Sequence, residues 1–169
     1  MMPAGALLDT SFLITLAGRD RANHQAAKQY WKYFLENQVP LYLSTIVVSE
    51  FSVKQALGPE ILRHCVVLPF NYQDALKSAE LHKLRYAAAG LSRDALKDDL
   101  KLIAQAQLAG AEFVVTDDSD TMFKFVQHLT AAAAVSVKAI KLEDGFDAAL
   151  FNGGQRDFNE QLGESDIGQ

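Results

Sequence analysis

Short apolar segments alternate with amphipathic patterns along most of the chain. The apolar segments cover residues 5–8, 41–43, 66–68 and 113–116, and a looser one covers 132–142. Between them, apolar residues recur at i, i+3 and i+4, which is typical of helices that bury one face. The expected helices cover residues 12–16, 23–34, 44–57, 71–89, 98–108 and 119–129. This alternation predicts a three-layer α/β/α domain with a central parallel sheet of four or five strands.

The end of the chain differs in composition from the rest. From Gly145 onward it is rich in Gly, Asn and Gln and carries five acidic residues against one basic residue, Arg156. We therefore expect one domain over residues 1–144 and a flexible, acidic, Gly-rich tail over 145–169. The alternative is that the tail docks on a surface through its apolar side chains, which are Phe146, Leu150, Phe151 and Phe158.

Composition also limits which cellular compartment and which kinds of binding partner we expect. A single cysteine, Cys65, allows no intramolecular disulfide, which fits a reducing compartment. The longest apolar run, residues 131–135, is far shorter than the ~20 residues that span a bilayer. We therefore expect a cytoplasmic protein without a membrane segment. The net charge of −5 argues against nucleic-acid binding by bulk charge, but it is compatible with a nuclease whose acidic pocket is masked by metal.

Acidic residues stand at the expected ends of strands and helices. An Asp between a strand and a helix is commonly an N-cap, so each of these residues has a purely structural interpretation. Glu50 is harder to explain in this way, because it shares a helical stripe with apolar residues and we expect it to point inward. The candidate acids are Asp9, Glu50, Asp98, Asp99, Asp117, Asp118 and Asp120.

Taken together, these acids favour a metal site. Asp9 and Asp118 follow two different strands, and ligands of open α/β sheets bind outside the carboxyl ends of the strands. Carboxylates held close together raise each other's pKa unless a cation intervenes. Ligands that are oxygen only, without Cys or His clusters, suit Mg²⁺ or Mn²⁺. The chain has no GxxxxGK phosphate loop and no HExxH motif, and its four histidines are scattered.

Four segments, in order, resemble the PIN-domain family, especially its toxin-like ribonucleases of the VapC kind. The segments are residues 7–14 (LLDTSFLI), 44–51 (STIVVSEF), 97–106 (KDDLKLIAQA) and 115–120 (VTDDSD). The resemblance implies metal ligands at Asp9, at Glu50, at either Asp98 or Asp99, and at Asp118 or its neighbour Asp117. Asp99 lies one residue earlier than the third acid of the family pattern, so the choice between it and Asp98 stays open.

The resemblance further implies a metal-dependent endoribonuclease that is the toxin of a toxin–antitoxin pair. Its catalytic acids would be Asp9, Glu50, Asp99 and Asp118, and its partners would be RNA, a cognate antitoxin and a second copy of the chain. Hydroxyl groups that would support the carboxylates are those of Thr10, Ser11 and Thr116. Side chains that would hold RNA are Arg85, Arg93, Lys97 and Lys101, although solvated helix faces are their commoner role.

The sequence leaves two further side-chain roles and the class of function open. Phe70 and Tyr86 can stack on RNA bases, but packing in the core is the commoner role of such side chains. The aromatic residues Tyr30, Trp31, Tyr33 and Phe34 exceed what one helix face buries, which favours self-association. The alternative functions are a non-catalytic scaffold that binds RNA or protein and, less favoured, a phospho-acceptor receiver domain.

Overall fold

The computed structural model describes residues 4–84 and 93–152 of the chain, without the side chains of 93–96. Five strands form one parallel sheet in the order β3-β2-β1-β4-β5. They are β1 (Ala6–Leu8), β2 (Leu41–Ser44), β3 (Cys65–Leu68), β4 (Phe113–Thr116) and β5 (Lys138–Lys141). The predicted α/β/α fold is therefore confirmed, with five strands.

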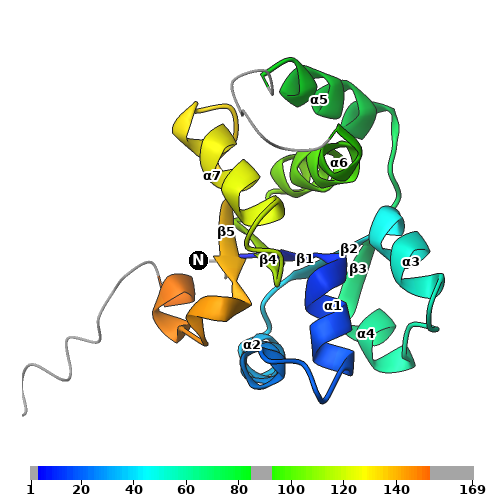
Figure 1. Ribbon diagram of the computed structural model, residues 1–169, viewed down its shortest axis with the longest axis vertical. Helices are drawn as coiled ribbons and strands as arrows, with labels where there is room; N and C mark the ends of the chain where they lie inside the picture. Colours follow the sequence, from blue (N-terminus) through cyan, green and yellow to red (C-terminus); the bar gives the residue numbers. More distant parts are fainter. Residues whose placement is uncertain (1–3, 85–92, 153–169) are drawn as a thin grey trace, which may run out of the picture.

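The helices cover both faces of the sheet (Figure 1). On one side lie α1 (Thr10–Ala17), α2 (His24–Glu36) and α4 (Pro59–His64), with α3 (Thr45–Ser52) beside the β2 and β3 end. On the other side lie α6 (Arg93–Ala109) and α7 (Met122–Ala131), and α5 (Tyr72–Lys83) packs on the outside of α6. No helix in these described stretches is both long and apolar enough to cross a membrane.

The core lies on both faces of the central strands. All residues of β1 and β4 are buried, as expected for parallel strands covered by helices on both sides. The edge strand β3 is much more open, and Val66 and Val67 are 57% and 41% exposed. The carboxyl ends of β1 and β4 are therefore fixed from all sides by packed side chains, and this rigidity positions the residues that follow them.

Several predicted boundaries were wrong. Helix α3 ends at Ser52 instead of continuing to 57. The Gly58-Pro59 pair, which we interpreted as a stop signal, begins the unpredicted helix α4, with proline at its first position. Helix α6 begins at Arg93, earlier than expected, and the closing strand contains only Lys138–Lys141. The predicted helix over 71–89 ends at Lys83 as α5, and residues 85–89 lie outside the described part.

The first residues of the predicted tail pack on the domain. Two short 3₁₀ helices, η2 (Leu142–Asp144) and η3 (Ala148–Asn152), carry the chain from β5 to α2. The ring of Phe146 lies 4.9 Å from that of Tyr30, and the ring of Phe151 lies 5.3 Å from those of Tyr33 and Phe34. The aromatic face of α2 is thus covered by its own chain. The flexible tail that we predicted from residue 145 is thus wrong for residues 145–152, and residues 153–169 lie outside the described part.

Candidate active site

The strand order brings acidic residues from distant parts of the chain to one edge of the sheet. Strands β1 and β4 are neighbours, and the chain winds away from this pair in opposite directions. Ligands of open α/β sheets bind at such a switch point, outside the carboxyl ends of the strands. Asp9 follows β1, and Asp117 and Asp118 follow β4, so these three residues stand at the switch point.

Asp9 has both a capping role and a place in the site. It is the N-cap of α1, and its carboxylate accepts a hydrogen bond from the Thr10 N–H at 2.8 Å. The same carboxylate accepts hydrogen bonds from the hydroxyls of Ser11 at 2.7 Å and Thr116 at 2.8 Å. Burial raises the pKa of Asp9, and these hydrogen bonds partly offset the effect. Asp9 is therefore a rigidly held carboxylate, only 6% exposed.

Glu50 lies in α3 and reaches the N-terminus of α1. The prediction that it points inward was wrong, because the buried face of α3 is formed by Val47 and Phe51, while Glu50 is exposed and Val53 is 81% exposed. The Thr10 hydroxyl donates a short hydrogen bond to the Glu50 carboxylate. Partial desolvation raises the pKa of Glu50, and the nearby negative charges of Asp98 and Asp9 raise it further.

Asp99 experiences the charges of four of the other candidate acids. Its pKa is raised to about 8, first by burial and then by the charges of Asp9, Asp118, Glu50 and Asp98, in that order. Asp98, one residue earlier on α6, instead forms an ion pair with Lys101, with Oδ1 2.9 Å from Nζ. Of these two residues, Asp99 is the one that lies among the other acids. No contact described in the structure gives its carboxyl group a basic partner.

The three acids after β4 have three different environments. The carboxylate of Asp117 accepts hydrogen bonds from the Thr15 hydroxyl at 2.5 Å and from the Asn23 side-chain amide at 2.7 Å. Asp118 caps its own turn, accepting from the Thr121 N–H at 2.8 Å through Oδ1, and no described residue donates to its Oδ2. Asp120 has a side chain that is 93% exposed and pairs with Lys124.

Hydroxyl groups link these carboxylates into one network. The Ser11 hydroxyl contacts Asp9, the Thr116 hydroxyl at 3.0 Å and the backbone N–H of Asp117 at 2.8 Å. The Thr116 hydroxyl in turn accepts from the Asp118 N–H at 2.9 Å. Thr15 and Asn23 also hold an acid but were not predicted, because nothing in their local sequence distinguishes them from ordinary helix and turn residues.

The donor set suits a hard cation, although the carboxylates do not form a closed chelate. Among the described residues, no three Asp, Glu, His or Cys side chains are placed as a ready-made metal cage. However, four carboxyl groups, those of Asp9, Glu50, Asp99 and Asp118, are close enough for charge coupling, and each offers oxygen ligands only. Oxygen donors of this kind fit Mg²⁺ or Mn²⁺, which would relieve the repulsion that raises the pKa of Asp99.

The predicted RNA-binding side chains are only partly described. Lys97 and Lys101 both lie on α6, where Lys97 is exposed and Lys101 is half-buried beside Asp98. Arg85 and Tyr86 lie outside the described residues, as does the side chain of Arg93. Phe70 is half-buried at the end of β3 and is not part of the hydrophobic core, so the core role that we considered commoner for it does not hold.

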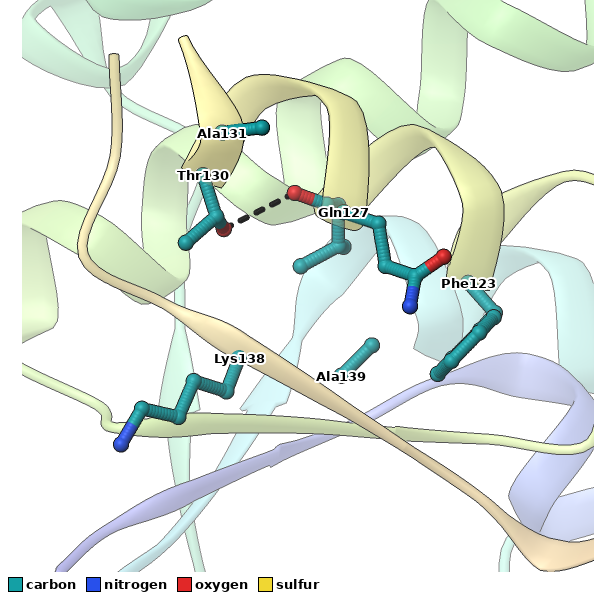
Figure 2. A pocket seen from close by; sticks show the side chains of 7 residues that line it. Phe123, Gln127, Thr130, Ala131, Lys138 and Ala139 are labelled. Atoms are coloured by element: carbon teal, nitrogen blue, oxygen red, sulfur yellow. Dashed lines mark hydrogen bonds between the residues drawn. The ribbon is translucent and has the colours of Figure 1, made fainter. Parts of the chain in front are cut away.

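A separate hollow of about 550 Å³ lies between α7 and the edge strand β5 (Figure 2). Phe123, Val126 and Ala139 form its apolar part, and Gln127 and Lys138 are at its rim. The Thr130 hydroxyl on its wall is already bonded to the carbonyls of Val126 and Val137. Because no carboxylate of the described part of the chain lines this hollow, it lacks the chemistry of the acidic edge.

Solved structures with the same fold include several toxin–antitoxin proteins. VapBC2 from Rickettsia felis, bound to a DNA fragment from their promoter, is 13% identical, with a TM-score of 0.54 over 80% of this chain and 97% of that one. FitAcB from Neisseria gonorrhoeae is 19% identical, with a TM-score of 0.57 over 82% and 98%. VapC20 from Mycobacterium tuberculosis, a sarcin–ricin loop cleaving toxin, is 19% identical, with a TM-score of 0.53 over 79% and 99%.

At these identities the likeness demonstrates a shared fold. No curated protein sequence matches the chain. The family model described as the PIN domain matches residues 6–129, a stretch that begins at β1 and ends in α7. It includes all four acidic segments and thus confirms the family that their order suggested. The chain belongs to the PIN-domain family.

Proposed function

We propose that the protein is a divalent-metal-dependent endoribonuclease that hydrolyses RNA phosphodiester bonds in the cytoplasm. The observation that carries the proposal is the environment of Asp99, whose carboxyl group is surrounded by the charges of four other acids at the switch point of the sheet. Such an arrangement costs stability in the absence of a cation. A cluster of acids that costs stability is physically reasonable where a cation binds to it and takes part in catalysis.

The metal would be held by Asp9, Glu50, Asp99 and Asp118, the four acids that also make up the catalytic set. Mg²⁺ or Mn²⁺ held by these residues would supply an activated water and would neutralise charge on the phosphate. Ser11 and Thr116 fix the orientation of Asp9, and Thr10 fixes that of Glu50. Asp98 has Lys101 as its partner, and Asp117 and Asp120 are engaged elsewhere, so we assign these three to supporting roles.

We further propose that the protein is the toxin of a toxin–antitoxin pair. Support comes from fold relatives whose names refer to such pairs, including the toxin–antitoxin complex from Klebsiella pneumoniae, 19% identical with a TM-score of 0.52. Self-association is part of the same proposal. The aromatic face of α2 no longer supports it, but the apolar surface of α4 and β3 does, where Leu62, Val66 and Val67 are 47%, 57% and 41% exposed.

The test is cleavage of an RNA with unpaired segments by the purified chain in Mg²⁺ or Mn²⁺, with EDTA as the metal-free arm. Glu50→Gln keeps the size of the side chain and removes one charge from the site, so activity should fall by orders of magnitude. The matched control is Glu36→Gln on α2, which removes the same charge from an exposed, remote position. Full activity of a folded Glu50→Gln protein would show that the chemistry is assigned to the wrong residues.

A further inference from the structure

A groove between α5 and α6 opens beside the acidic edge. It encloses about 370 Å³ and is lined by Phe70, Ala75, Ser78, Ala79, His82 and Lys101. Phe70 is two residues beyond the end of β3, so this side of the groove starts at the edge of the sheet where Asp9 and Asp118 stand. Its volume lies at the lower end of the range of about 300–1,000 Å³ for small-ligand sites, which suits one flat group and not a long segment.

Phe70 is held in place without being buried. Its N–H donates to the Thr45 hydroxyl at 3.2 Å, which ties the loop after β3 to the first turn of α3, the helix that carries Glu50. The ring is half-buried and makes no part of the hydrophobic core. An aromatic ring that lines a groove and has an anchored backbone is a suitable surface for stacking.

Lys101 connects this ring to the acidic segment. Its Nζ lies 6.0 Å from the centre of the Phe70 ring and 2.9 Å from Oδ1 of Asp98. An ammonium group has three N–H donors, and the contact with Asp98 uses one of them. The other two are available to an anionic group that enters the groove, such as a phosphate.

The part of the groove contributed by α5 is made largely of small side chains. Ala75, Ser78 and Ala79 follow the i, i+3, i+4 spacing of one helix face, and α5 buries only Asp74 and Leu81 among its twelve residues. Small residues at these three positions leave room that a Leu or Met would fill. The groove is therefore lined by small side chains from α5 and by the ring of Phe70, with the ammonium group of Lys101 contributed by α6.

We infer that this groove binds one unpaired nucleobase of the RNA substrate, stacked on Phe70, with its phosphate at Lys101. A base has to leave its helix to stack on a side chain, so the groove selects single-stranded or looped RNA over duplex RNA. The bound nucleotide would lie beside Asp98, the neighbour of Asp99 in the chain, which would bring the adjoining backbone toward the acids. This inference rests on the proposed ribonuclease function and specifies the substrate class of that site.

The experiment measures RNA binding in the Glu50→Gln background with Mg²⁺, so that the RNA stays intact. Phe70→Ala should weaken the binding of a short unstructured RNA roughly 5- to 150-fold, which corresponds to about 1–3 kcal/mol for one stacked base. Phe70→Tyr keeps a ring and should bind as the parent does. Tyr72→Ala is the matched control, because Tyr72 is a neighbouring aromatic residue that is 73% exposed and does not line the groove.

A spectroscopic readout tests stacking itself. RNAs that carry 2-aminopurine at successive positions should show quenched emission at one position, and Phe70→Ala should abolish the quenching while leaving the thermal unfolding temperature close to that of the parent. Equal RNA affinity of parent and Phe70→Ala, or equal loss for duplex RNA, would overturn the inference. So would a Phe70→Ala variant that loses only binding to a protein partner, since the groove would then be a peptide site.

The outcome is separable from that of the proposed function. If Phe70→Ala weakens the binding of single-stranded RNA in the Glu50→Gln background, but the chain with Glu50 intact never cleaves RNA, the groove is correctly assigned and the catalytic proposal is wrong. If the chain cleaves RNA and Phe70→Ala changes neither binding nor quenching, the catalytic proposal stands and the groove assignment is wrong.

Discussion

Replacing Asp99 with asparagine should change the stability of the protein in opposite directions with and without metal. In the absence of metal the substitution removes a carboxyl group that is desolvated and repelled by Asp9, Asp118, Glu50 and Asp98, so it should stabilise the fold. In the presence of metal it removes a ligand, so the stabilisation that Mg²⁺ or Mn²⁺ provides should shrink or vanish. Few surface substitutions produce such a reversal.

The magnitude follows from the pKa. The pKa of Asp99 is about 8 in the folded protein, against an ordinary value of 3.8. Between these values the folded chain holds a proton that the unfolded chain has released, so the free energy of unfolding falls as the pH rises from about 4 to 8. The full effect above pH 8 has an upper limit on the order of 5 kcal/mol. Because the side chain is partly exposed and can relax toward water, we expect about 1–3 kcal/mol.

The assay is urea or thermal unfolding of the parent and Asp99→Asn at pH 6 and pH 9, in EDTA and in excess Mg²⁺. In EDTA, Asp99→Asn should gain more at pH 9 than at pH 6. The parent should gain about 2.7 kcal/mol at a hundredfold excess of metal over Kd, and the variant much less. Asp20→Asn, at an exposed position far along the chain, controls for the loss of one charge. An Asp99→Asn protein that is no more stable than the parent at pH 9 in EDTA would refute the reasoning.

Further predictions concern the supports of the site and the C-terminal segment. Asp117→Asn should cost about 1–3 kcal/mol in urea unfolding, because one of the donors on Thr15 and Asn23 loses its acceptor, yet it should keep the stabilisation by metal. Phe151→Ala should cost about 2–4 kcal/mol, whereas truncation of its exposed neighbour in Leu150→Ala should cost less than 1 kcal/mol. Light scattering should give about twice 18.6 kDa if the proposed self-association is real, and a monomer at high concentration would contradict it.

The sheet could be predicted from the sequence because its signal is local. Residues 113–116 form a continuous apolar run between polar residues, and they became β4 with the predicted bounds. Helix ends were predicted less well, because the signals compete. Gly58-Pro59 can end one helix or begin another, and only the packing of the chain before β3 decides between the two.

The orientation of Glu50 illustrates a different limit. A helical wheel places it with Ile46 and Val53, and this led us to expect an inward position. The wheel gives the relative angle of side chains but not the direction of the core, which here lies along Val47 and Phe51. Tertiary packing fixed that direction. The same holds for the C-terminal segment, where the sequence offered both a free tail and a docked one, and the rings of Phe146 and Phe151 are docked on α2.

Asp117 and Asp118 show why a motif alone does not assign chemistry. They are adjacent, both follow β4, and either fits the acidic position of the family pattern. Successive side chains at the end of a strand point in different directions, so two neighbouring carboxylates face different elements. Asp117 faces α1 and the start of α2, where Thr15 and Asn23 bind both of its oxygens. The charge of Asp118 raises the pKa of Asp99, and no described residue donates a hydrogen bond to Oδ2 of Asp118. The geometry at the end of β4 therefore gives Asp117 a structural role and leaves Asp118 as the acid that we expect to bind metal.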